Sequence, residues 1–333
     1  MLLDKNYILF FFFILTLNFS IVYTHEKWSK IYNIYDYPDK IRKNHQRPTP
    51  LTGGLIILIN LFFVTTYQNI FNEKFFISNY DLNTVFIVGT IFFLLGSYDD
   101  KKSISPLLKL ALKTLIILIL LIYEPSILIT KLKFSFINKT IGLSYNGSLL
   151  FTTLCFLLFI NAFNMFDGID LQSGFYALIL TSYFLILGFH DSYFTIILIS
   201  ILTFMYINFN KKSFIGDSGI FLLSIIFGYF FIKFYNAQII KTTDEIFLLM
   251  LLPGIDMLRL FVIRIYNKKN PFKADRNHIH HLLLNKYNYV VAILFIASFL
   301  LLCLIFAIFL ENYLLVITLL LLFYFSFLKF LRN

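Results

Sequence analysis

Apolar runs of about 20 residues recur along this chain from end to end, and this feature constrains the fold more than any other. A helix of that length crosses the hydrocarbon core of a bilayer. The chain is 59% hydrophobic and only 14% charged, whereas soluble domains carry roughly 25% charged residues. No polar stretch is long enough to fold a separate core. We therefore predict an all-α polytopic membrane protein, organised as a single integral membrane domain over residues 1–333.

Eleven membrane spans fit these runs. The first could imitate a signal peptide, but it is long for one, and no small-x-small cleavage site precedes His25, so we expect a retained helix. An odd number of spans places the two termini on opposite sides of the membrane. The predicted spans are 7–24, 51–68, 82–98, 106–123, 148–165, 171–189, 192–208, 218–236, 245–265, 289–310 and 313–330.

Lys and Arg residues predict the orientation of these spans. The alternate segments that include 25–50, 264–287 and the C-terminus carry 19 of them, and the segments on the other side carry 7. The positive-inside rule places the first set in the cytoplasm, so the N-terminus is expected outside and the C-terminus in the cytoplasm. The formal charge of +10 then reflects topology and phosphate-bearing partners, and we expect no nucleic-acid partner.

Five unusual polar clusters all fall in the segments assigned to the cytoplasm. If these loops assemble into one active site, the five clusters have to lie on the same side of the membrane. By contrast, segment 124–147 on the other side is expected to form only a small hairpin. The clusters lie at 45–54, 99–100, 164–170, 216–219 and 275–281.

The cluster that ends the fifth predicted span has the most regular spacing. Four polar residues recur there at every third position: Asn161, Asn164, Asp167 and Asp170. Neighbours three apart share a face of a helix, and Gly168 allows the turn to loosen beside the acids. Ionisable groups at the end of a membrane helix indicate a functional site, although a polar helix end that meets the headgroups is the simpler alternative.

Three further aspartates indicate a metal. Asp99 and Asp100 are adjacent, and two carboxylates side by side repel unless a cation or a proton joins them. Magnesium is the hard cation that carboxylates and phosphate oxygens share. Asp217, framed by Gly216 and Gly219, could approach the same ion, although a turn or helix cap accounts for it equally. We expect Mg²⁺, with Mn²⁺ as the alternative.

A histidine loop supplies the positive side of the predicted site. His278, His280 and His281 lie beside Arg276, and such groups suit phosphates and sugar hydroxyls. A zinc site is the alternative, but the chain offers no Cys partner and no His-Glu-x-x-His pattern.

The glycine pair Gly53-Gly54 follows a basic loop that contains His45. It allows either close helix packing or the approach of backbone to a ligand. The chain has no P-loop and no dinucleotide fingerprint, so ATP-driven transport and Rossmann chemistry lack their signatures. Taken together, the loops fit phosphoryl transfer between a soluble nucleotide compound and a lipid-borne phosphate, by positioning and charge neutralisation.

In these motifs the chain resembles the polyprenyl-phosphate N-acetylhexosamine-1-phosphate transferases, glycosyltransferase family 4. Within that family it is most similar to the bacterial undecaprenyl-phosphate N-acetylglucosamine-1-phosphate transferases, which share the eleven spans. The motifs are Arg42-x-x-His45 with Pro50 and Gly53-Gly54, Asp99-Asp100, Asn161-x-x-Asn164-x-x-Asp167-Gly168-x-Asp170, Phe214-x-Gly216-Asp217-Ser218-Gly219, and His278-Ile279-His280-His281.

The resemblance implies a reaction and a location. A UDP-N-acetylhexosamine and a polyprenyl phosphate would react with magnesium to give a polyprenyl-diphosphate sugar and UMP. This would start cell-envelope polysaccharide synthesis, such as lipopolysaccharide, at the bacterial inner membrane. The His-Ile-His-His form favours N-acetylglucosamine as the sugar; another UDP-N-acetylhexosamine and phospho-N-acetylmuramoyl-pentapeptide are alternatives. A one-step reaction, an aspartyl intermediate and a homodimer all stay open.

The resemblance also assigns roles by motif position. Asp99 and Asp100 would be the acidic pair at the reacting phosphates, with Asp99 as the base, and both would share the metal with Asp217. Asp167 and Asp170 would complete the catalytic set. The substrate-binding residues would be His45, Asn164, Asn208, Phe214, Arg276, His278, His280 and His281.

Two departures from the family pattern lie on the expected nucleotide-sugar side and leave the sugar open. After Asp170 the family continues Gly-Leu-Ala-x-Gly, whereas this chain has Leu171-Gln172-Ser173-Gly174. The loop between Asn208 and Asp217 lacks the usual Pro-Ala.

Two other classes of protein compete with an enzyme. A transporter or flippase would carry charges deep within its spans, and we read the deep positions as almost uncharged, with Lys113 and Glu245 near span ends. A non-catalytic scaffold leaves the one-sided polar clusters unexplained.

Overall fold

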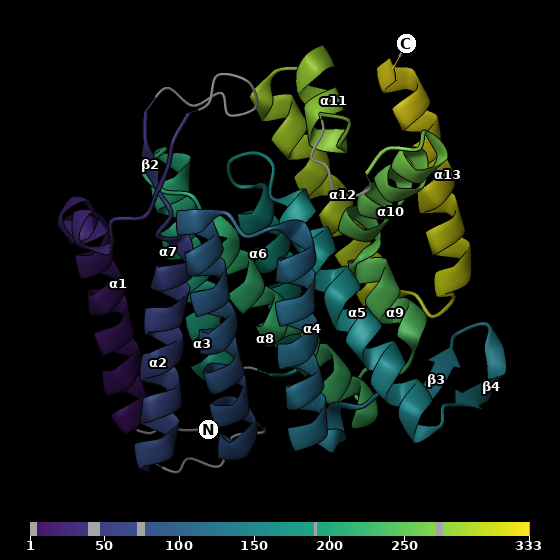
Figure 1. The fold of residues 1–333 in the computed structure, drawn as a ribbon. Coiled ribbons are helices and arrows are strands. Elements are labelled where there is room, and N and C mark those ends of the chain that lie inside the picture. The colour runs from purple at the N-terminus through teal and green to yellow at the C-terminus, as the bar shows by residue number, and fades with distance from the viewer. Residues whose placement is uncertain (1–4, 39–46, 72–76, 190–191, 271–275, 333) are drawn as a thin grey trace. The chain divides into compact units, whose positions relative to one another are not determined.

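The computed structural model describes residues 5–38, 47–71, 77–189, 192–270 and 276–332. In these ranges the chain forms thirteen α-helices, one short 3-10 helix and two antiparallel strand pairs (Figure 1). The chain divides into two compact units, which we describe separately. Unit 1 comprises Met1–Ile104 and Thr181–Ile225, and unit 2 comprises Ser105–Leu180 and Ile226–Asn333.

Unit 1 is built around helix α2, which packs against α3 and α7, while α1 packs against α7 (Figure 1). A two-residue ladder joins the strands that follow α1 and precede α2. The elements of this unit are α1 (Lys5–Tyr32), β1 (Tyr35–Asp36), β2 (Thr49–Pro50), α2 (Gly53–Phe71), α3 (Asn79–Lys102), α7 (Ser192–Phe209) and the first half of α8 (Gly216–Asn236).

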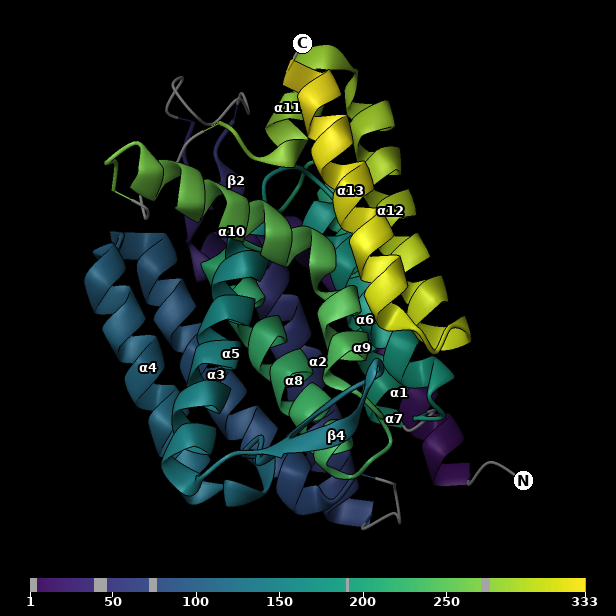
Figure 2. The same ribbon diagram turned by 90° about the vertical axis from the view of Figure 1, so that its right-hand side faces the viewer.

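Unit 2 is built around α5, which packs against α4 and α10. Helices α12 and α13 run alongside each other, and α10 crosses obliquely in front of α5 (Figure 2). The elements are α4 (Pro106–Tyr123), η1 (Pro125–Ile127), β3 (Lys131–Phe134), β4 (Ile137–Gly142), α5 (Tyr145–Phe166), most of α6 (Gln172–Ile186), the rest of α8, α9 (Thr243–Leu249), α10 (Leu251–Tyr266), α11 (Ile279–Lys286), α12 (Tyr289–Phe309) and α13 (Tyr313–Arg332).

The helices begin where the sequence offers capping side chains. The hydroxyls of Ser78, Ser105 and Ser144 each accept from a backbone N–H of the first turn of α3, α4 and α5. Pro106 opens α4, at a position where a missing N–H costs nothing. Within the helices every backbone group can pair with the next turn, and this is the condition for crossing a bilayer.

Each of the eleven predicted spans coincides with a helix or a helix pair. Eight helices of the described chain are long and apolar enough to cross a membrane, and a ninth candidate is the pair α9 and α10, bent by 79°. Helices α6 and α7 are apolar but shorter. These features agree with a polytopic membrane protein, while the number of spans and their orientation stay predictions. The expected hairpin in 124–147 is confirmed as β3 and β4.

The break inside predicted span 245–265 was not foreseen. Thr243–Leu249 and Leu251–Tyr266 are separate helices, and Met250 between them has non-helical backbone. Short helix α11, inside a segment that we expected to be a loop, was also missed.

Candidate active site

In unit 1, the carboxylate of Asp100 caps a helix far along the chain. Its two oxygens accept from the backbone N–H groups of Asp217 at 2.9 Å and Ser218 at 3.1 Å, in the first turn of α8. Those N–H groups have no partner within the helix, and the helix N-terminus carries a partial positive charge. The contact therefore places the Asp99-Asp100 motif directly against the Gly216-Asp217-Ser218-Gly219 motif, as the sequence predicted.

Close backbone packing makes this contact possible. Gly216 has φ +71°, and a Cβ there would lie 2.6 Å from Asp100 Oδ2, so a larger residue would disturb both the turn and the cap. Gly54 packs directly on Gly219. The Gly53 and Gly54 N–H groups donate to the carbonyls of Phe214 and Ile215 at 3.0 and 3.1 Å. Of the two readings of the glycine pair, the structure shows close helix packing.

The side chains of Asp100 and Asp217 lie close enough to repel each other. Asp99 is buried, and its Oδ1 accepts from the Ile104 N–H at 2.7 Å, which fixes the turn after α3. Among the described residues no group of three or more His, Cys, Asp or Glu side chains is arranged to hold a metal ion. Magnesium, however, is usually bound by one or two carboxylates together with substrate phosphates. The Asp100–Asp217 pair fits that pattern.

Asn208 and Phe214, which were expected to bind the nucleotide, also lie in unit 1. Both make hydrogen bonds that fix the loop between α7 and α8. The buried Asn208 amide donates to the Ser213 carbonyl at 2.8 Å. The Phe214 N–H donates to the Pro50 carbonyl at 3.0 Å. These contacts join the end of α7 to the strand before α2, and the Phe214 ring is half-buried.

In unit 2, the acid loop at 161–170 begins as a helix and then leaves it. Helix α5 ends at Phe166, so Asn164 lies in its last turn, whereas Asp167 is the C-cap and Asp170 lies beyond. The three-residue spacing therefore does not give one helical face for all four residues. Leu171 follows with φ 65°, a left-handed conformation, and Tyr289 Oη donates to the Asp170 carbonyl at 2.8 Å.

The histidine loop rests directly on this acid loop. The His280 imidazole packs against Gly168, at the point where a Cβ would overlap its ring. Its ring lies parallel to that of His278, with centroids 5.5 Å apart, and 4.3 Å from the His281 ring. Burial, with smaller contributions from His281 and His278, lowers the pKa of His280 to about 3. His280 is therefore neutral at pH 7, while Arg276 at the start of the loop is exposed.

A buried polar network behind the histidine loop was missed by the sequence analysis. Asp256 Oδ2 lies 2.7 Å from His278 Nδ1. Its Oδ1 accepts from Arg259 at 2.7 Å, from the Tyr324 hydroxyl at 2.7 Å and from the Ile279 N–H at 3.2 Å. Arg259 also donates to the Asn277 carbonyl at 2.7 Å. The network thus joins α10, α11 and α13.

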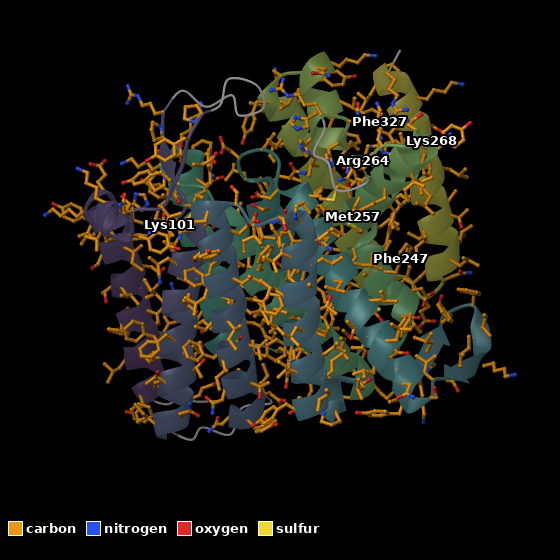
Figure 3. All side chains as sticks on the ribbon, viewed as in Figure 1. Lys101, Phe247, Met257, Arg264, Lys268 and Phe327 are labelled. Atoms are coloured by element: carbon orange, nitrogen blue, oxygen red, sulfur yellow. The ribbon has the colours of Figure 1, made fainter. Side chains whose placement is uncertain are left out.

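This network corrects our reading of the deep positions as almost uncharged. Asp256 and Arg259 lie inside predicted span 245–265, and both are buried. Met257 and Arg264, labelled in Figure 3, lie on the same helix before and after Arg259. An acid and a base three residues apart in an apolar run were the available signal, because such a pair shares a helix face. Lys113 is buried as well, and donates to Asn161 Oδ1 at 2.9 Å.

Each unit thus brings some of the predicted residues together. Unit 1 joins Asp100 to the Asp217 loop, and unit 2 joins the acid loop to the histidine loop. That all five clusters form one pocket stays a prediction. His45 lies outside the described residues.

Comparison with known proteins supplies the family. A model of glycosyl transferase family 4 matches residues 82–235. An undecaprenyl-phosphate alpha-N-acetylglucosaminyl 1-phosphate transferase of Thermotoga maritima is 30% identical over 271 residues, 79% of this chain and 77% of the relative. The protein of that name from Escherichia coli K12 is 25% identical, with 78% and 71% covered. A phospho-N-acetylmuramoyl-pentapeptide-transferase of Dictyoglomus thermophilum is 29% identical, with 67% and 71% covered. The extent of these matches shows that the chain belongs to glycosyl transferase family 4.

Proposed function

We propose that this protein transfers N-acetylglucosamine-1-phosphate from UDP-N-acetylglucosamine to undecaprenyl phosphate and releases UMP. An oxygen of the lipid phosphate attacks the sugar-bearing phosphorus and forms a new P–O bond. The P–O bond to the UMP oxygen breaks, so UMP leaves with the electron pair. The observation that carries this proposal is the 30% identity to a transferase of that name across 79% of the chain.

The two described sites suit this chemistry. Asp100 and Asp217 would hold Mg²⁺ or Mn²⁺, which would neutralise phosphate oxygens in the reaction. Asp99, at the end of the same helix, is the proposed base. In unit 2, the imidazoles of the histidine loop lie beside the Asp167 and Asp170 loop and offer donors for phosphate and sugar oxygens.

A second substrate deserves a parallel test because a relative of the other branch is nearly as similar, at 29% identity. That relative is named for phospho-N-acetylmuramoyl-pentapeptide. The Leu171-Gln172 departure lies in the acid loop, where it could alter sugar selection.

The deciding experiment supplies membranes containing the protein with undecaprenyl phosphate, Mg²⁺ and one labelled UDP-sugar at a time. Lipid-linked product and UMP are measured. We expect turnover with UDP-N-acetylglucosamine above that with UDP-N-acetylmuramoyl-pentapeptide or UDP-N-acetylgalactosamine. The reverse preference would reassign the sugar, and turnover with none of them would reject the reaction.

We further propose that the protein lies in the bacterial inner membrane with eleven spans, its N-terminus outside and its C-terminus in the cytoplasm. The 19 to 7 distribution of Lys and Arg supports this orientation. Single cysteines introduced near Lys101 and in the histidine loop should react with a membrane-impermeant maleimide only from the cytoplasmic side. Labelling of the two positions from opposite sides would reject a shared site.

A further inference from the structure

The Asp256 network requires an explanation because ionised groups are costly to bury. Asp256 is 2% exposed and Arg259 is 8% exposed. Replacing a buried ion pair by apolar residues of similar volume is often neutral or stabilising, so stability alone is weak grounds for such a pair. A role in fixing the geometry of a neighbouring group is the better-supported reading where that group belongs to a site.

Two side chains other than His278 hold the carboxylate of Asp256. Arg259 neutralises it at 2.7 Å, and the Tyr324 hydroxyl, which also accepts from Arg259 Nε at 3.1 Å, binds the same carboxylate oxygen. Arg259 supplies the charge that balances the Asp256 carboxylate, and Arg259, Tyr324 and the Ile279 N–H all bind Oδ1. The second carboxylate oxygen is therefore left for the imidazole.

The contact to His278 decides which ring nitrogen remains available. Nδ1 lies 2.7 Å from Asp256 Oδ2, so this nitrogen donates its proton to the carboxylate. Only Nε2 of His278 then remains to meet a substrate oxygen. The partner of one imidazole nitrogen sets the state of the other in this way in many sites.

The orientation of His278 also affects the next histidine. The rings of His278 and His280 are parallel within 2°, and His280 packs on Gly168 of the acid loop. A rotation of the His278 ring would disturb this stack. The Asp256–His278 contact and the packing of His280 on Gly168 are thus linked through one pair of parallel rings.

We propose that Asp256 is a positioning residue for phosphosugar transfer: it fixes His278 through Nδ1, presents Nε2 to the substrate and holds the His278–His280 stack against the acid loop. Arg259 and Tyr324 hold Asp256 in place for this task. The inference rests on the proposed function, because it assumes that His278 meets a substrate.

The principal test is Asp256→Asn, assayed with UDP-N-acetylglucosamine and undecaprenyl phosphate. Loss of the partner that orients a metal-bound histidine typically costs about 10- to 100-fold, and we use this range for the partner of His278. We expect a loss of that size in kcat with KM for the UDP-sugar changed less than threefold, because the interaction would matter most in the transition state. Tyr324→Phe removes one hydrogen bond and keeps the ring, so it should give a smaller loss in the same direction.

A matched control variant distinguishes a loss of His278 positioning from a general loss of protein stability. Asp244 begins α9 in the same unit, and its carboxylate accepts from the Ser135 N–H at 3.0 Å and from the Ser135 hydroxyl. Asp244→Asn is the same chemical change outside the site, and it should leave turnover near the wild-type value. If Asp256→Asn fails to accumulate in the membrane, Tyr324→Phe still decides: unchanged kcat in that variant overturns the proposal.

A double-mutant cycle asks whether Asp256 acts through His278. In the His278→Ala background, Asp256→Asn should cause little further loss, because the group that it positions is already gone. Losses that simply multiply, or wild-type turnover in His278→Ala, would overturn the proposal.

A reading independent of turnover keeps this inference separate from the proposed function. The reaction rate of His278 with diethyl pyrocarbonate, followed by peptide mass, should change severalfold in Asp256→Asn and not in Asp244→Asn. If the wild type makes no product but this change occurs, the proposed reaction fails while the positioning stands. An unchanged rate overturns the positioning itself.

Discussion

Each of the two units contains a buried or half-buried carboxylate that joins distant segments of the chain. The two carboxylates differ in the kind of group that donates hydrogen bonds to them. In unit 1, Asp100 is held by backbone N–H groups of α8 and lies near a second carboxylate, Asp217. In unit 2, Asp256 is held by the side chains of Arg259, Tyr324 and His278. Backbone dipoles offset a negative charge only partly, whereas Arg259 neutralises it. The first arrangement therefore favours a cation from outside, and the second is complete within the chain.

The largest effect is expected when the carboxylate charges of unit 1 are removed. Asp99→Asn, Asp100→Asn and Asp217→Asn should each lower transfer by about 1,000-fold or more, since each would lose a base or a ligand of the metal at the reacting phosphates. The measurement is the rate of labelled lipid product in membranes. Each variant should still insert, which detergent extraction and gel filtration would check. Normal turnover in all three variants would remove unit 1 from the chemistry.

Metal removal tests the need for an outside cation. Chelation by EDTA should abolish transfer, and Mg²⁺ should restore it, with Mn²⁺ as a substitute, because carboxylates and phosphates share hard cations. In Asp217→Asn, a higher Mg²⁺ concentration should be needed for any remaining turnover. Full activity in EDTA would mean that backbone donors alone balance the unit 1 acids.

Gly168→Ala tests the contact between the loops of unit 2. The added methyl would overlap the His280 ring, and crowding of this kind typically costs about 1–3 kcal/mol. We expect lower transfer together with a lower Tm. The control is Gly254→Ala in α10, where an added methyl meets nothing within 4 Å, and it should be neutral or slightly stabilising. Equal behaviour of the two variants would contradict the packing of His280 on Gly168.

Acid should destabilise unit 2 through His280. The ordinary pKa is 6.5, and burial lowers the pKa of the folded imidazole to about 3. As the pH falls below 6.5, the unfolded chain binds a proton that the folded protein does not, so the free energy of unfolding decreases. The slope from this one group approaches about 1.4 kcal/mol per pH unit only well below pH 6.5, where the unfolded imidazole is fully protonated. The Tm should therefore fall between pH 7 and pH 5, and His280→Gln should flatten that fall. An equally steep fall in the variant would assign the effect to other groups.

The smallest expected effect concerns the residue that departs from the family pattern. Leu171 has φ 65°, and the left-handed region costs an L-residue roughly 1–2 kcal/mol, which glycine avoids. The greater freedom of glycine in the unfolded chain cancels part of that gain. Leu171→Gly should therefore raise stability by at most about 1 kcal/mol, measured as a small increase in Tm. A decrease would show that the Leu171 side chain contributes packing that outweighs the strain.

The sequence predicted the helical framework well, because membrane spans are encoded locally by apolar length. The positions of α1 to α8, α12 and α13 follow from such runs. Convergence of the polar loops was expected in general terms, and the structure shows two such contacts: Asp100 with the Asp217 loop, and the acid loop with the histidine loop. The Asp256 network was not expected from the sequence. Tyr324 lies 68 residues from Asp256, and only the folded chain brings the two side chains together. The bend at Met250 was not predicted either. An apolar stretch has the same composition whether it forms one continuous helix or two helices joined by a bend.

The cap that Asp100 places on α8 links a proposed metal ligand to the stability of that helix. The same two oxygens that would face a cation also anchor the first turn of a helix that is buried almost throughout. Replacing this acid would therefore remove a helix cap as well as a proposed metal ligand. A loss of activity at this position has to be read together with the stability of the variant, because one side chain serves both.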